Sequence, residues 1–179
     1  IELKEELRLL GWKFSSGTDS EVLLAAYQQW GDKCLDKLNG MWAFVIYNRV
    51  DKSIFASRDR YGIKPFYYYK TENFLAFSSE IPPLLSLLPG KPEPDSQSVF
   101  DYMVFNRTDQ TSRTFFAGIK KLQHGQNLSV RYNSETGIPE VKFKKWYDLR
   151  EVVSGTKGFS RPEEFKNLFS SAIELRLRS

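Results

Sequence analysis

The sequence predicts an α+β domain whose antiparallel sheet is covered on both faces, and two observations carry this prediction. Residues 41–47 (MWAFVIY) form an unbroken run of aromatic, apolar and β-branched side chains, which is typical of a strand buried on both faces. Three more short strands are predicted over 53–57, 66–70 and 74–78, with short polar connections between them. Strands joined so closely are expected to pair as one antiparallel meander. A second layer must then lie against it.

Amphipathic patterns predict helices before these strands. Residues 1–10 place apolar side chains among Glu, Lys and Arg and end at Gly11, which suits the position after a helix. A second helix is predicted to begin at Thr18, because Thr18 and Glu21 have the spacing of a capping box. That helix is expected to end at Gly31.

The rest of the chain predicts shorter elements, and residues 148–160, spotted with glycine and serine, predict a linker. The other predicted elements are strands over 12–14, 126–131 and 141–147, a turn at 134–137, helices over 32–38, 82–88 and 96–105, the last of these capped by Asp95, and a final helix that starts with a capping box of Ser160 and Glu163. The final helix has no cap at its end, and the chain starts at Ile1 rather than Met. We therefore expect the natural protein to extend beyond both ends.

Composition excludes several classes of protein. The 179 residues are 41% hydrophobic and 15% aromatic, which excludes a disordered chain. A single cysteine excludes an intramolecular disulfide and fits a reducing compartment, so a cytoplasmic location is expected. Lys and Arg number 26 against 22 Asp and Glu, and strand alternation places Lys142 and Lys144 on one solvated sheet face. Neither a nucleic acid nor a membrane is expected as a partner.

Few residues carry recognisable catalytic chemistry. Cys34 lies beside apolar neighbours and is predicted to be a small buried hydrophobe rather than a nucleophile. His124 is the single histidine and lies in a turn-like segment, so neither a Ser-His-Asp triad nor a paired-histidine metal site is predicted. We therefore assign no catalytic residue and no metal ligand.

Two charged segments are candidates for a site. Asp19 falls in the first turn of its helix, and a capping box of Thr18 and Glu21 would leave its carboxylate free to pair with an ammonium group. An acid at this position also serves the helix dipole, so the pattern alone leaves both roles open. Likewise, the cluster at 58–60 (RDR) follows an apolar strand and is either an ion-pair network that braces a loop or part of a site.

A series of motifs runs in order through nearly the whole chain. Its main segments are 17–22 (GTDSEV), 26–27 (AY), 30–31 (WG), 38–41 (LNGM), 43–44 (AF), 58–68 (RDRYGIKPFYY), 77–81 (FSSEI) and 115–119 (FFAGI). This series resembles the glutamine-hydrolysing asparagine synthetases, in particular their class II glutamine amidotransferase domain. The central block at 58–68 is highly specific.

The resemblance implies a fold and a division into domains. It implies an incomplete four-layer αββα sandwich of the N-terminal-nucleophile hydrolase type over residues 1–148. A linker over 149–160 would follow, and residues 161–179 would form the first helix of an α/β, ATP-dependent synthetase domain. In this family, the acid that corresponds to Asp19 binds the α-amino group of glutamine.

The resemblance also implies an activity for the parent protein. The parent would hydrolyse glutamine to glutamate and ammonia, then use ATP and Mg to activate aspartate, which the ammonia converts to asparagine. The family nucleophile is a cysteine at the first residue of the mature protein, and neither Ile1 nor Cys34 corresponds to it. The pyrophosphate loop of the family is absent as well. We therefore expect this chain to be an inactive fragment that binds no cofactor.

Some alternatives stay open. The same amidotransferase module could feed ammonia to another acceptor in a different amide-forming enzyme. A non-enzymatic interaction module that has lost the nucleophile is the other alternative. Strand edges exposed by missing strands favour self-association, so a homodimer is a candidate assembly.

Overall fold

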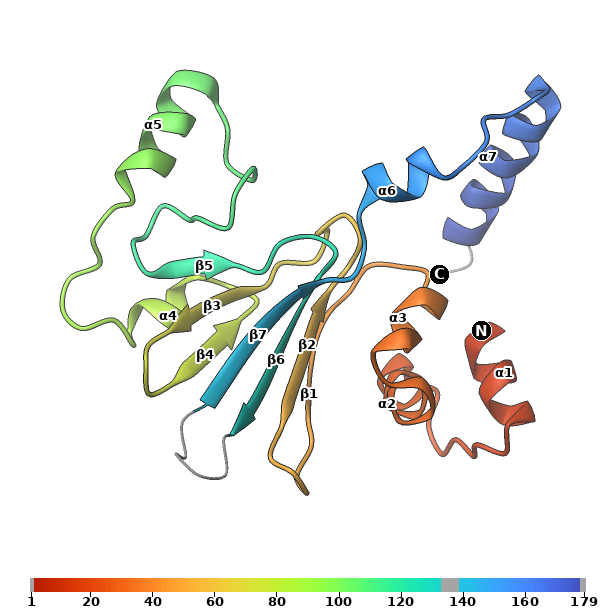
Figure 1. Cartoon of the computed structure of the whole chain (residues 1–179), viewed down its shortest axis with the longest axis horizontal. Coiled ribbons are helices and arrows are strands. Elements are labelled where there is room, and N and C mark those ends of the chain that lie inside the picture. Colours follow the sequence, from red (N-terminus) through yellow and green to blue (C-terminus); the bar gives the residue numbers. More distant parts are fainter. Residues whose placement is uncertain (1, 133–138, 178–179) are drawn as a thin grey trace. The chain divides into compact units, whose positions relative to one another are not determined.

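The computed structural model describes residues 2–132 and 139–177, and it has a mixed α+β fold with antiparallel sheets (Figure 1). The chain divides into two compact units, residues 1–147 and 148–179. The predicted turn at 134–137 lies outside the described residues. Among the helices described, none is both long and apolar enough to cross a membrane.

The first unit begins with helices at positions close to those predicted. They are α1 (Glu2–Leu9), α2 (Asp19–Trp30), the 3-10 turn η1 (Gly31–Lys33) and α3 (Cys34–Lys37). The predicted strand over 12–14 is wrong, since these residues form a loop. Trp12 and Phe14 pack instead against the core that the helices form, and the indole N–H of Trp12 donates to Gln29 Oε1 at 2.9 Å. Apolar–polar alternation over three residues does not distinguish an extended loop from a strand, because a strand also needs a neighbouring strand to pair with.

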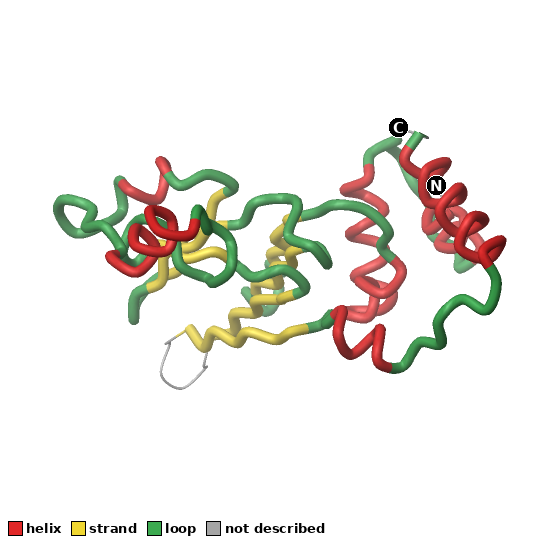
Figure 2. The backbone as a smooth tube through the Cα atoms, turned by 90° about the horizontal axis from the view of Figure 1, so that it is seen from above, coloured by secondary structure: helices red, strands yellow, loops and turns green. Residues whose placement is uncertain are grey.

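Two antiparallel sheets follow, and Figures 1 and 2 show them side by side within the first unit. The first has the order β1 (Ala43–Tyr47), β2 (Ile54–Arg58), β6 (Gln126–Tyr132) and β7 (Pro139–Lys145), and the second has the order β4 (Leu75–Ser78), β3 (Tyr67–Lys70) and β5 (Ile119–Lys121). The prediction of a single four-stranded meander is therefore wrong. Strands β1 and β2 form one hairpin and β3 and β4 another, but β2 takes the distant β6 as its second neighbour.

Each face of the first sheet contributes to a different apolar core. On one face, Phe55 of β2 joins a cluster formed mainly by α1, α2 and α3, which includes Leu7, Ala26 and Leu35. On the other face, Leu128 of β6 joins a cluster that includes Tyr68 of the second sheet. The four-layer αββα arrangement itself stays a prediction.

The remaining elements are α4 (Pro82–Leu85) and α5 (Ser96–Phe105) in the first unit, and α6 (Leu149–Ser154) and α7 (Pro162–Arg176) in the second. The predicted cap of α5 is confirmed, since Ser98 N donates to Asp95 Oδ1 at 2.9 Å. The predicted capping box of α7 is wrong. Arg161 is the N-cap residue, and the amide of Ser160 donates to Glu164 rather than to Glu163. Helix α6 lies within the stretch predicted as a linker.

Candidate functional site

Asp19 is the first residue of α2 and lies exposed at the end of the loop that joins α1 to α2. Among the residues that the structure describes, its carboxylate makes no hydrogen bond and no ion pair. The carboxylate is therefore available to a ligand.

The capping box predicted to leave Asp19 free does not form. The Thr18 side chain does not cap α2 and instead lies 2.9 Å from the hydroxyl of Ser16. The carboxylate of Glu21 accepts hydrogen bonds from the backbone amides of Ser15 and Ser16, both at 2.8 Å, and from their hydroxyls at 3.0 and 2.7 Å. The loop before α2 folds back over the first turn of the helix. The amides of Ser15 and Ser16, rather than the amide of Thr18, therefore donate to Glu21. Glu21 thus holds the loop that leads into Asp19.

These hydrogen bonds stabilise the ionised form of the Glu21 side chain. Hydrogen bonds from the Ser15 amide, the Ser16 hydroxyl and the Ser16 amide lower the pKa of Glu21 from 4.5 to about 2. Because the pKa of Glu21 is lower in the folded state than in the unfolded chain, its carboxylate stabilises the fold fully at every pH above the unfolded pKa. This contribution of Glu21 to the stability of the fold is lost as the pH falls through the pKa of Glu21 in the folded state.

Replacing Glu21 tests this linkage. Glu21→Gln keeps the size of the side chain but removes its charge, so we expect a lower melting temperature at pH 7. The difference from the parent chain should shrink as the pH falls from about 4.5 to about 2. Thermal melts across this range, with the exposed Glu72→Gln as control, provide the measurement. A pH-independent difference would show that Glu21 does not act through its charge.

The segment 58–60 braces a loop rather than forming an open site. Asp59 is 1% exposed, and its carboxylate accepts the amides of Trp42 at 3.3 Å and of Tyr61, Ile63 and Lys64 at 3.0 Å each. Burial alone would raise the pKa of Asp59, but the backbone hydrogen bonds together lower it. The carboxylate therefore holds the connection from β2 toward β3.

The two arginines of this segment bind backbone oxygens. The guanidinium of Arg58 donates to the carbonyls of Lys64, Leu122 and Gly62 at 2.6–2.7 Å. That of Arg60 donates to the carbonyl of Leu38 at 2.6 Å and also lies over the rings of Trp42, Trp146 and Tyr147. The bracing interpretation is confirmed, but hydrogen bonds to the backbone take the place of the predicted ion pairs.

Cys34 is fully buried, as predicted. Burial, followed by the nearby charges of Asp32 and Asp36, raises the pKa of its thiol to about 11. A thiol with so high a pKa carries almost no thiolate at neutral pH, and the thiolate is the nucleophilic form. Cys34 is therefore a core residue.

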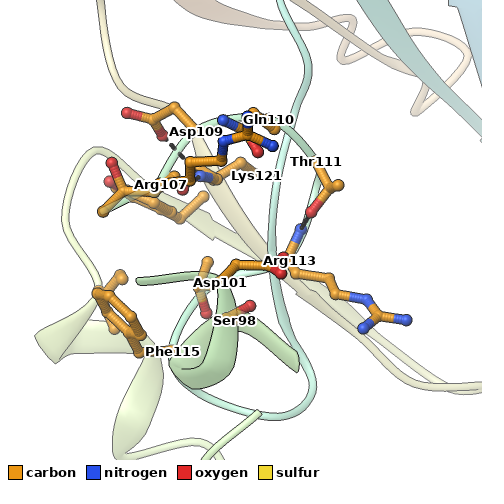
Figure 3. Close-up of a pocket in the computed structure, with 13 residues that line it drawn as sticks. Ser98, Asp101, Arg107, Asp109, Gln110, Thr111, Arg113, Phe115 and Lys121 are labelled. Atoms are coloured by element: carbon orange, nitrogen blue, oxygen red, sulfur yellow. Dashed lines mark hydrogen bonds and ion pairs between the residues drawn. The ribbon is translucent and has the colours of Figure 1, made fainter. Parts of the chain in front are cut away.

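A pocket of about 180 Å³ lies beside α5 and was not predicted from the sequence (Figure 3). Strand β5, which was not predicted from the sequence, places Lys121 there with 5% of its surface exposed. Its ammonium group donates to Thr108 O and Asp109 Oδ1, both at 2.6 Å, and Figure 3 shows Asp109 and Lys121 meeting there. The guanidinium of Arg113 extends away from them. Since Asp109 already neutralises the buried cation, we assign this pocket no ligand.

Comparisons with known proteins identify the family of this chain. Residues 1–147 match the glutamine amidotransferase domain. The glutamine-hydrolysing asparagine synthetase 1 of Bacillus subtilis is 30% identical over 179 residues, which are 100% of this chain and 27% of that protein. Amidase chry2 of Gibberella zeae is 35% identical over 177 residues, which cover 94% of this chain and 24% of that protein.

A solved structure supports the fold. The glutamine phosphoribosylpyrophosphate amidotransferase of B. subtilis superimposes with a TM-score of 0.51 at 17% identity, over 82% of this chain and 26% of that one. At this identity the likeness concerns the fold alone. The chain spans about a quarter of the length of all three proteins. Because the family match extends from residue 1 to residue 147, the chain belongs to the glutamine amidotransferase domain family, and the resemblance to asparagine synthetases seen in its motifs is confirmed.

Proposed function

We propose that this chain is the glutamine-binding part of an asparagine synthetase and that Asp19 binds the α-amino group of glutamine. The observation that carries the proposal is the exposed carboxylate of Asp19 at the start of α2, which has no partner among the described residues and lies in the segment 17–22 that resembles the family motif. A carboxylate and an ammonium group form a charge-assisted hydrogen bond. Glu21 would keep the preceding loop in place for it.

The wider proposal concerns the parent protein. Residues 1–148 would belong to a four-layer amidotransferase domain, residues 149–160 to a linker and residues 161–179 to the start of a synthetase domain. The parent would act in the cytoplasm, as a homodimer, and convert aspartate to asparagine with ATP and Mg. The described residues contain no group of three or more His, Cys, Asp or Glu that could hold a metal ion. ATP and Mg would bind in the synthetase domain of the parent, and we propose no residue of this chain as a ligand for either.

This chain alone is proposed not to hydrolyse glutamine. Hydrolysis by this class of enzyme needs an activated cysteine. The sole cysteine, Cys34, is buried with its pKa raised to about 11. The role left for the described residues is to bind and orient the amino acid.

Replacing Asp19 tests the proposed function in the full-length protein that carries this sequence. Asp19→Ala is expected to raise the KM for glutamine about 10- to 100-fold, which corresponds to the loss of one hydrogen bond to a charged group, about 1.5–3 kcal/mol. Synthesis from added ammonium should stay within about twofold of the unaltered protein, since ammonia bypasses the glutamine site. Steady-state rates with each nitrogen donor provide the measurement.

The matched control is Asp36→Ala, which removes another exposed carboxylate from a neighbouring helix. It should leave both activities unchanged. Equal loss of the glutamine-dependent and ammonia-dependent activities in Asp19→Ala would remove Asp19 from the glutamine site.

A second candidate is an amidase or amide-forming enzyme with another acceptor. The observation that favours it is the 35% identity to Amidase chry2, which covers 94% of this chain. A panel of carboxylic acids offered to the full-length protein with glutamine and ATP separates the two candidates, because only the asparagine synthetase proposal requires aspartate to be the preferred acceptor.

A further inference from the structure

The hydroxyl of Ser16 takes part in three hydrogen bonds within the loop that joins α1 to α2. It donates to Glu21 Oε2 at 2.7 Å, and it lies 2.9 Å from the hydroxyl of Thr18. The backbone amide of Thr18 also donates to it, at 3.3 Å. Ser16 Oγ therefore links the carboxylate of Glu21 to Thr18, the residue immediately before Asp19.

The direction of these hydrogen bonds follows from the chemistry of the groups. An ionised carboxylate has no proton to donate, so the single proton of the Ser16 hydroxyl goes to Glu21. The lone pairs of Ser16 Oγ are then left for Thr18, which donates both its hydroxyl proton and its amide proton. Removal of the Ser16 hydroxyl would thus break all three hydrogen bonds at once.

The backbone of Ser16 is held by both helices. Its amide donates to Glu21 Oε2, on α2, at 2.8 Å, and its carbonyl accepts the ammonium group of Lys4, on α1, at 2.9 Å. Lys4 Nζ also lies 5.1 Å from the centroid of the Phe14 ring, which keeps the lysine beside the loop. Ser16 is therefore fixed through its side chain, its amide and its carbonyl.

The carboxylate of Asp19 is the group in this loop that remains available to a cation. Lys4 together with residues 15–21 has one cation and two carboxylates, and hence a net charge of −1. The carboxylate of Glu21 already accepts hydrogen bonds from Ser15 and Ser16. A charge-assisted hydrogen bond is short and weakens when its partners are misplaced, so the position of Asp19 determines how well an ammonium group binds.

We propose that Ser16 is a positioning residue, which fixes Thr18 and thereby holds the carboxylate of Asp19 where the α-ammonium group of glutamine binds. This role rests on the proposed function of Asp19 and adds a specificity to it. The loop selects amides that carry an α-ammonium group over 4-carbamoylbutanoate, which is glutamine without its amino group. Because Ser16 acts through Asp19, loss of its hydroxyl weakens the recognition of the ammonium group alone.

Steady-state kinetics of the full-length protein that carries this sequence test the proposal. Ser16→Ala should raise the KM for glutamine about three- to tenfold and leave kcat and the ammonia-dependent synthesis within about twofold. The inhibition constant of 4-carbamoylbutanoate against glutamine should also stay within about twofold, since this molecule has no ammonium group to misplace. Ser16→Thr keeps the hydroxyl and should restore the KM.

The matched control is Ser15→Ala. The hydroxyl of Ser15 donates to Glu21 at 3.0 Å and has no hydrogen bond to Thr18 among the described residues, so its loss should change the KM less than about twofold. If Ser16→Ala does not fold, Thr18→Val decides in its place, because it removes the Thr18 hydroxyl from the same link while keeping the shape of the side chain. It should also raise the KM for glutamine, and an unchanged KM would refute the positioning role.

Asp19→Ala separates this proposal from the proposed function. If Asp19→Ala raises the KM for glutamine and Ser16→Ala does not, the positioning role is refuted while the proposed function stands. Equal increases in the KM for glutamine and in the inhibition constant of 4-carbamoylbutanoate would refute it as well, because they would show a general disturbance of the site. The double variant should bind glutamine no more weakly than Asp19→Ala alone, and additive losses would contradict an action through Asp19. An unchanged KM in Asp19→Ala would overturn the proposed function itself.

Discussion

Asp59→Asn is expected to lower the free energy of unfolding by about 3–5 kcal/mol, the range for breaking a buried, charged hydrogen-bond network. Four backbone amides point at the Asp59 carboxylate, from Trp42 and from the loop at 61–64. Asparagine has nearly the same size but one acceptor oxygen, and its amide nitrogen would face other donors. The loop connecting β2 to β3 would lose the group that orders it.

Urea denaturation at pH 7 measures this loss. The matched control is Asp36→Asn, an exposed carboxylate on α3 whose replacement should change the unfolding free energy by less than about 0.5 kcal/mol. Since hydrogen bonding lowers the pKa of Asp59, the advantage of the parent chain over Asp59→Asn should decrease in acid, as the folded carboxyl becomes protonated. Equal midpoints for the two variants would refute this role.

Gly125→Ala is expected to destabilise the fold by about 2–4 kcal/mol, from a left-handed backbone and a steric clash together. Gly125 has a φ of +60°, and an added Cβ would lie 2.5 Å from the carbonyl oxygen of Tyr147. The approach is close because the Gly125 carbonyl accepts the amides of Trp146 and Tyr147, at 2.8 and 3.2 Å. These hydrogen bonds attach the last residues of the first unit to the turn before β6.

Gly90→Ala separates the two causes. Gly90 also has a positive φ, +87°, but no atom lies within 4 Å of an added Cβ. Its replacement should therefore show the backbone cost alone, about 1–2 kcal/mol. Chemical denaturation of both variants gives the comparison. Equal losses would mean that the contact with Tyr147 contributes nothing.

Local patterns predicted the helices and hairpins well where a single segment contains the whole signal. Asp95 caps α5 as predicted, because the cap and the amide that it accepts are three residues apart. The same reasoning failed for the two capping boxes. Glu21 binds the amides of Ser15 and Ser16, and the amide of Ser160 binds Glu164. The spacing of residues in the sequence shows which carboxylate and amide can form a hydrogen bond, but the path of the loop before the helix determines which of them do.

The sequence by itself determined the α+β class, most element positions, the burial of Cys34 and the family resemblance, because each depends on neighbouring residues or on ordered motifs. Only the tertiary structure decided that β2 pairs with β6 and that Asp59 binds four amides. The pairing of β2 with β6 joins residues 70 to 76 positions apart. Such contacts depend on which surfaces pack together as the chain folds, and a local sequence pattern does not specify this packing.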